Sequence, residues 1–232
     1  ARRETLAVRG GSDEHVEVVE THHGTVIAGS VESGYGISLA DPGATPTAWV
    51  DATYAAMKAT NAQDFQSAMA GWTDRVNNYP YADVDGNFGY TLRGRIAVRG
   101  EENGWGPVAG WTGQHEWQGV IPPDEMPHAH NPSTGWAVTC NQRIVDQHYP
   151  YYLTHSFGPD YRAHRIIERL EAARGTPLDA AAMPAIHGDT GSVPAATVMA
   201  AMSDVKPATP VSAEALSILE NCMLAPIWVR KT

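Results

Sequence analysis

The sequence predicts an α+β protein, with antiparallel strands in its first part and a helical C-terminal part. Three observations support this fold class. Short segments of alternating apolar and polar residues, separated by glycine-rich turns, occupy residues 4–39. An Asp-Gly pair between two further alternating segments is typical of a β-hairpin. Beyond residue 160, apolar residues recur at the three- and four-residue spacing of helices.

The composition is that of a folded, acidic protein. The chain has 232 residues, of which 43% are hydrophobic and 18% are charged, and its formal net charge is −10. This length is enough for one or two domains with a substantial core. The acidic balance argues against nucleic acid or an anionic membrane as a partner. No apolar run has the length of a membrane span.

Four strands are predicted in the N-terminal part, and glycine-containing turns separate several of them. They cover residues 4–9, 15–20, 24–27 and 36–39. A loop rich in proline and threonine, at residues 41–47, ends this β region.

Two helices are predicted next. Asp51 is placed to cap a helix that ends near Ala59. Asn61 or Asp64 is placed to cap a second helix that ends near Trp72.

A β-hairpin follows the two helices. Alternating segments at 79–84 and 88–92 flank Asp-Gly-Asn at 85–87, which predicts the hairpin turn. Residues 83–87 also resemble the start of a calcium loop. The glycine comes too early for an EF-hand and no glutamate closes the loop, so the hairpin is favoured.

Residues 94–135 are predicted to be mostly loop, rich in Gly, Pro and Trp. A loop of this length inside a compact domain is usually functional or wraps a neighbour. His128 and His130 would lie on one side of an extended strand, as in some metal sites. Pro127 and Pro132 favour a surface loop instead.

Asn141 is the most informative residue. It ends the apolar segment 136–140, a predicted buried strand, and begins a polar turn. A side-chain amide held at the end of a strand is a good hydrogen-bond donor to a developing oxyanion. Arg162, at the start of the next predicted helix, is placed either to fix this amide or to pair with a nearby carboxylate.

The last part of the chain is predicted to be helical. A helix at 160–174, a turn at 194–202 and a helix at 212–224 follow one another. Glutamates between the arginines of the first helix predict a solvated face with ion pairs. We therefore divide the chain into a β-rich part, 1–174, with two helices and the long loop, and a helical tail, 175–232.

The two cysteines, Cys140 and Cys222, form neither a metal-binding spacing nor a disulfide framework. One bridge between them stays open. The position of Cys140 in an apolar segment favours packing as a small hydrophobic residue.

No residue is an evident nucleophile. Ser156 and Ser192 lie beside turns and outside a Gly-x-Ser-x-Gly elbow, so helix or turn capping is the expected role. Asp189 could be catalytic, but ordering the turn before Pro194 is favoured.

His22 and His23 end a predicted strand. A histidine pair could bind a metal or act as a base. The sequence places no carboxylate or third ligand at a fixed local spacing, so a structural role is favoured and no metal site is predicted.

Several blocks, taken together, resemble the β chain of the penicillin acylase (penicillin amidase) family of N-terminal-nucleophile hydrolases. Each block alone is weak, but their order and combination are specific and extend to about residue 205. The blocks are residues 21–27, 81–90, 108–113 with 116–117, 131–132 with 135–141, 146–150 and 161–170.

The resemblance implies an αββα sandwich of two antiparallel sheets between helical layers. It implies a serine at the N-terminus of the β chain as nucleophile, exposed by autoproteolysis of a precursor, with its own α-amine as base. The serine, the α chain and the remainder of the β chain are then expected outside residues 1–232. The family resemblance also implies a periplasmic or secreted location.

The resemblance assigns roles to individual residues. Asn141 matches the family's oxyanion-hole asparagine, and Arg162 matches an arginine that positions it and the substrate. Cys140 and Trp111 are expected to line part of the acyl pocket. The chemistry requires no cofactor. The family often binds a structural calcium, but one ligand position is Leu153 here and calcium ligands are not evident.

The predicted function is hydrolysis of linear N-acyl amide bonds in a small-molecule substrate. Penicillins or cephalosporins and acyl-homoserine lactones are both open as substrates. The alternative is a non-catalytic acylase-like binding module, whose loop from Trp111 to Trp117 holds an apolar ligand or partner, or an inactive fragment.

Overall fold

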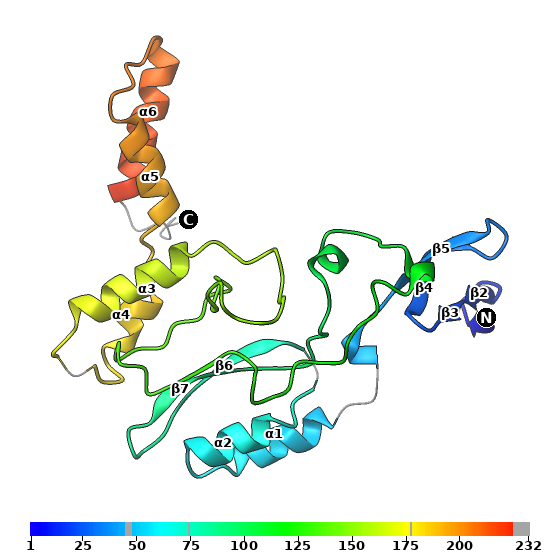
Figure 1. The fold of residues 1–232 in the computed structure, drawn as a ribbon. Helices are drawn as coiled ribbons and strands as arrows, with labels where there is room; N and C mark the ends of the chain where they lie inside the picture. The colour runs from blue at the N-terminus through cyan, green and yellow to red at the C-terminus, as the bar shows by residue number, and fades with distance from the viewer. Residues whose placement is uncertain (45–47, 74, 177, 225–232) are drawn as a thin grey trace. The chain divides into compact units, whose positions relative to one another are not determined.

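The chain folds into antiparallel sheets and helices, as Figure 1 shows for the computed structural model. This arrangement confirms the predicted α+β class. No described helix is both long and apolar enough to cross a membrane. The residues that the structure describes are 1–44, 48–73, 75–176 and 178–224. Residues 45–47 of the predicted loop at 41–47 lie outside them.

The chain divides into two compact units. The first comprises Ala1–Ala137 and Val145–Ser156, and the second comprises Val138–Ile144 and Phe157–Thr232. The boundary expected after residue 174 falls inside the second unit.

Five short strands form two sheets in the first forty residues. One sheet pairs β1 with β2, and the other has the order β3-β4-β5, with all neighbours antiparallel. The strands are β1 (Arg2–Leu6), β2 (Glu14–Val18), β3 (Glu20–Thr21), β4 (Gly24–Ser30) and β5 (Tyr35–Leu39). The segment predicted as one strand at 15–20 is interrupted at Val19 and contributes to two strands.

Helices α1 (Trp49–Met57) and α2 (Ala62–Met69) follow. Asn61 caps α2, because its Oδ1 accepts a hydrogen bond from the backbone N–H of Asp64 at 2.9 Å. Asp51 does not cap α1 as predicted, since α1 begins at Trp49. Asp51 lies in its first turn, where a negative charge still favours a helix N-terminus.

The predicted hairpin is confirmed by β6 (Asn77–Ala82) and β7 (Phe88–Arg93), which pair from Asn77 with Arg93 to Ala82 with Phe88. The Asp83 carboxylate orders the turn by accepting hydrogen bonds from the backbone N–H groups of Asp85 and Asn87. It also accepts the N–H of Ala62 at 3.0 Å and so connects the hairpin to the start of α2.

The histidines predicted to lie in a surface loop form a strand instead. β8 (His128–His130) pairs antiparallel with β7, with Gly89 opposite His130. Pro127 does not prevent this, because its carbonyl accepts a hydrogen bond from Leu92 N at 2.9 Å. Gly89 is required, since a Cβ there would lie 1.9 Å from the carbonyl oxygen of Ala129.

The rest of the long loop is irregular but well connected. It contains the short 3-10 helices η2 (Glu101–Gly104) and η3 (Gly110–Thr112). Val98 N donates to the Gly119 carbonyl at 3.0 Å, and Gln118 N donates to the Val98 carbonyl at 2.8 Å. These bonds fix the segment that follows Glu116.

The second unit contains four helices in its described part: α3 (Tyr161–Ala172), α4 (Met183–His187), α5 (Val193–Met202) and α6 (Pro210–Leu224). The segment expected as a turn at 194–202 is the helix α5, and α4 was not predicted. Ser192 caps α5 by accepting a hydrogen bond from Ala195 N at 3.3 Å, which confirms its expected capping role.

Candidate active site

Asn141 lies in a turn rather than at the end of a strand. Residues 136–140 do not form the predicted strand. The φ angle of Asn141 is 69°, in the left-handed region, which asparagine adopts more readily than most residues with a side chain. The sharp change of direction at Asn141 is therefore compatible with an amide side chain at this position.

The side chain of Gln142 forms hydrogen bonds to the backbone of residues 138 and 140, as a neighbouring strand would do. Its Oε1 accepts a hydrogen bond from Cys140 N at 2.5 Å, and its Nε2 donates to the Val138 carbonyl at 2.9 Å. Backbone groups that a neighbouring strand would satisfy are thus satisfied from within the segment. This explains why an apolar run can enter the turn without joining a sheet.

Arg162, in the first turn of α3, holds the Asn141 side chain. Its Nη2 donates to Asn141 Oδ1 at 2.8 Å and to the Cys140 carbonyl at 2.7 Å. A guanidinium can only donate, so the oxygen of the amide must face it and the NH2 group points elsewhere. No hydrogen bond within the described residues engages Asn141 Nδ2, which leaves two N–H donors for a ligand.

Gly158 contacts the backbone of the same turn. Its N–H donates to the Asn141 carbonyl at 2.7 Å. A Cβ at residue 158 would lie 3.1 Å from the Cβ of Asn141, closer than an ordinary contact. The backbone of Asn141 is therefore fixed by Gly158 while Arg162 fixes its side chain.

The remaining predicted site residues lie in different surroundings. Cys140 is a free thiol, 7% exposed, which confirms its packing as a small apolar residue. Trp111 lies on η3 in the first unit and is 88% exposed. Asn141 and Arg162 are both exposed to solvent.

Asp189 anchors the helices of the second unit. Both of its carboxylate oxygens accept hydrogen bonds from Arg165 at 2.9 Å, and Arg169 Nε lies 3.1 Å from Oδ2. Asp189 Oδ1 also accepts the N–H of Gly191 at 2.8 Å, so it orders the turn before α5 as predicted. The hydrogen bonds from Arg165 lower the pKa of the Asp189 carboxyl.

Arginines in α3 and just after its end form the predicted ion pairs. Arg165 Nη1 lies 3.0 Å from Glu168 Oε2, and Arg174, two residues beyond the end of α3, has its Nη2 2.6 Å from Glu171 Oε1. Arg162 differs from them, because its described hydrogen bonds go to an amide and a carbonyl oxygen. It is thus the arginine of this helix that serves the Asn141 turn.

Comparisons with known proteins agree with the resemblance. Residues 1–222 match the family described as penicillin amidase. The chain is 40% identical over 193 residues to the penicillin acylase 2 proenzyme of Pseudomonas sp. (strain SE83), which covers 82% of this chain and 24% of that protein. It is 30% identical over 171 residues to the acyl-homoserine lactone acylase QuiP of Pseudomonas fluorescens (strain Pf0-1), covering 72% of this chain and 21% of that protein.

A solved structure shows the same fold. The thermostable penicillin G acylase from Alcaligenes faecalis in orthorhombic form superposes with a TM-score of 0.70 at 22% identity, over 93% of this chain and 40% of that chain. The predicted place within an N-terminal-nucleophile hydrolase fold is thereby confirmed. The chain spans about a quarter of the length of the two relatives named, 24% and 21%. This chain belongs to the penicillin amidase family.

Proposed function

We propose that this chain is an internal β-chain segment of an N-acyl amide hydrolase, in which Asn141 stabilises the oxyanion. The observation that supports the proposal is the hydrogen bond of 2.8 Å from Arg162 Nη2 to Asn141 Oδ1. It orients the amide so that its N–H groups are free for a ligand. A donor that is already oriented needs no rearrangement when negative charge develops, which makes it effective in catalysis.

The proposed reaction is acyl transfer in two steps. The hydroxyl of an N-terminal serine outside residues 1–232 attacks the amide carbonyl, and its α-amine accepts the proton. The carbonyl oxygen becomes an oxyanion that accepts a hydrogen bond from Asn141 Nδ2. The amine leaves with the proton, and water then cleaves the acyl-enzyme through a second oxyanion at the same place.

In this proposal Arg162 is a positioning residue. It touches Asn141 and the Cys140 carbonyl, and it acts through them. Its positive charge also polarises the amide and strengthens the N–H donors. Cys140, next to Asn141 in the sequence, is proposed to contribute to the acyl pocket.

The proposed substrates are small molecules in which an acyl group is joined to an amine by a linear amide. Penicillin acylase and acyl-homoserine lactone acylase relatives support this class, because both names specify removal of an acyl group. The nucleophile and the rest of the enzyme are proposed to come from an α chain and further β-chain sequence. Exposed apolar residues on β4 and β5, such as Ile27 at 61% and Tyr35 at 71%, are consistent with such additional contacts.

One observation favours a second candidate, a binding module without catalysis. Trp111 is 88% exposed in the long loop and offers an apolar surface to a ligand or partner. A full-length protein that lacks a serine at a cleavage junction and binds an N-acyl amine without turnover would support this alternative.

The test of the hydrolase is Asn141→Gly in the full-length protein that contains this chain. Glycine adopts the left-handed backbone at φ 69° readily, and the substitution removes the side chain that carries the amide. We expect kcat for a chromogenic N-acyl amide to fall roughly 100- to 1,000-fold, the usual effect of losing one oxyanion donor.

Asn131→Gly is the matched control. Asn131 also has a positive φ, 46°, but its side chain accepts a hydrogen bond from Phe88 N in the hairpin. This variant is expected to lose stability and keep its kcat. Equal kcat for Asn141→Gly and the wild type would refute the oxyanion role of Asn141.

A further inference from the structure

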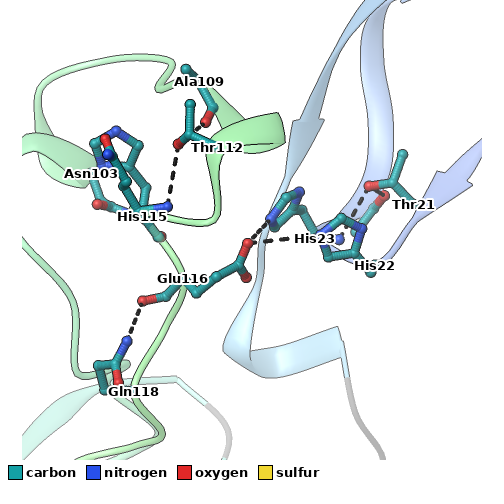
Figure 2. Close-up of polar contacts among 11 residues, drawn as sticks. Thr21, His22, His23, Asn103, Ala109, Thr112, His115, Glu116 and Gln118 are labelled. Carbon is teal, nitrogen blue, oxygen red and sulfur yellow. Dashed lines mark hydrogen bonds and ion pairs between the residues drawn. The ribbon is translucent and has the colours of Figure 1, made fainter.

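The fold brings a carboxylate to the histidine pair at the turn between β3 and β4. Figure 2 shows the rings of His22 and His23 turned toward Glu116. Glu116 Oε1 lies 2.8 Å from His23 Nε2 and 3.8 Å from His22 Nε2. One ligand atom from each of the three residues can be chosen so that all lie within 4.8 Å of one another.

The hairpin turn explains how two adjacent histidines face the same group. In a strand, successive side chains point to opposite faces. His22 and His23 instead form the two-residue turn between Thr21 and Gly24, which pair with each other. Thr21 Oγ1 accepts the N–H of His23 at 3.2 Å and donates to the Gly24 carbonyl at 3.1 Å, so two hydrogen bonds fix the turn. Figure 2 shows Thr21 beside His22 and His23.

Further contacts with neighbouring residues position Glu116 and His23. The carbonyl of Glu116 accepts a hydrogen bond from Gln118 Nε2 at 3.2 Å, and the backbone N–H of Gln118 donates to the Val98 carbonyl at 2.8 Å. Gly110 lies against the imidazole, since a Cβ there would be 3.1 Å from His23 Cε1. The acceptor and one ring are therefore ordered before any ligand arrives.

The distances suit a small tetrahedral ion. Bonds of about 2.0–2.1 Å to nitrogen and oxygen place neighbouring ligand atoms roughly 3.3 Å apart. The observed 2.8 and 3.8 Å bracket this value. The adjustment is small, and the His22 side chain is 73% exposed, with its ring centroid 3.7 Å from that of His23.

The donor set selects the class of metal. Two imidazoles and one carboxylate suit Zn²⁺ and similar transition metals, whereas Ca²⁺ prefers oxygen ligands throughout. Three protein ligands also leave a coordination position for water. Within the described residues, this is the one group of three His, Cys, Asp or Glu side chains arranged to hold a metal.

We propose that His22, His23 and Glu116 bind one divalent transition-metal ion of the Zn²⁺ type. The ion takes the place of the hydrogen bond between His23 Nε2 and Glu116 Oε1, with the ring of His23 neutral and protonated on Nδ1. The ion joins the β3–β4 turn to the long loop at residues 94–135. Its ligands His23 and Glu116 are 93 positions apart in the sequence. The proposal does not depend on the acylase activity.

The test uses the full-length protein after removal of metal with a chelator. Bound Co²⁺ is measured after dialysis and by visible absorption, and Zn²⁺ is titrated by calorimetry and thermal unfolding. The variants are His22→Asn and Glu116→Gln, of which the second can keep a hydrogen bond to His23. The wild type is expected to bind one more equivalent of Co²⁺ than either variant, and only the wild type should gain Tm from Zn²⁺ at this site.

Glu102→Gln is the matched control. Glu102 Oε1 lies 3.2 Å from His115 Nδ1, so it forms a histidine–carboxylate pair of the same type without a third ligand. This variant should bind as much Co²⁺ as the wild type. Equal Co²⁺ binding by the wild type, His22→Asn and Glu116→Gln would overturn the proposal and leave only a hydrogen bond. Displacement of the Co²⁺ by an equal concentration of Ca²⁺ would overturn the choice of metal class.

Discussion

Arg162 and Asn141 are joined by a hydrogen bond of 2.8 Å, although 21 residues separate them in the sequence. The same guanidinium nitrogen also holds the Cys140 carbonyl at 2.7 Å. One arginine therefore fixes both the side chain of Asn141 and the backbone that precedes it. If the amide acts on an oxyanion, its orientation depends on this contact.

Replacing Arg162 should lower turnover through Asn141. In the full-length protein, Arg162→Gln is expected to reduce kcat by about 10- to 100-fold with less effect on KM, because the amide loses its fixed orientation. Arg162→Lys keeps the charge but lacks the planar guanidinium, and we expect it to recover only part of the loss.

The combination with Asn141→Gly separates positioning from a general structural role. Once the amide is removed, Arg162→Gln should cost little further kcat, because the two residues act as one unit. Fully additive losses in the double variant would contradict the positioning role.

Gly158→Ala should disturb the same turn by steric contact. The added methyl group would lie 3.1 Å from the Asn141 Cβ and 3.2 Å from its carbonyl oxygen. The turn must shift by a few tenths of an ångström, which we expect to lower kcat roughly tenfold. Gly106→Ala is the control, because a Cβ there meets nothing within 4 Å. If steady-state kinetics of the Gly158 variant match those of the control, the close contact has no role in placing the amide.

Gln142→Leu should destabilise the segment that leads to Asn141. It removes the acceptor for Cys140 N and the donor for the Val138 carbonyl, and Cys140 is buried. An unsatisfied buried backbone group costs about 1–3 kcal/mol, so thermal unfolding of the full-length variant should show a lower Tm. Gln142→Glu keeps the acceptor, so its Tm should lie between those of the wild type and Gln142→Leu. If Gln142→Leu has the same Tm as the wild type, the two hydrogen bonds of Gln142 do not stabilise this segment.

Asp189 should stabilise the folded protein near neutral pH and lose this effect in acid. The hydrogen bonds from Arg165 lower the pKa of its carboxyl in the folded state, while an unfolded aspartate titrates near about pH 3.9. As pH falls below about 4–5, the unfolded state takes up a proton that the folded state does not. The contribution of Asp189 to the free energy of unfolding therefore decreases, and it is lost once the pH has fallen below the pKa of the folded state.

Asp189→Asn should remove this pH dependence. Stability of the variant, followed by denaturant unfolding between about pH 6 and pH 3, should be lower near neutrality and fall less steeply with acid than that of the wild type. Asp204→Asn, at an exposed position of the second unit, is the control and should follow the wild type. If the unfolding free energies of the wild type and Asp189→Asn change with pH in parallel, the interaction between Asp189 and Arg165 does not contribute to the pH dependence of stability.

The sequence by itself determined the features that depend on neighbouring residues. The hairpin around Gly86, the Asn61 cap of α2 and the Ser192 cap of α5 each follow from local hydrogen bonding and turn preference. The α+β class and the family also follow from the sequence, because they rest on periodicity and on the order of short motifs.

Only the tertiary structure decided the features that depend on residues far apart in the chain. His128–His130 became a strand because β7 offers a backbone edge, and residues 136–140 did not because Gln142 satisfies part of their backbone instead. The histidine pair lacked a carboxylate at local spacing, yet folding supplied Glu116 from 93 residues away. Local preference acts over a few residues, whereas hydrogen-bond partners and ligand sets are chosen by chain packing, which spacing along a sequence does not encode.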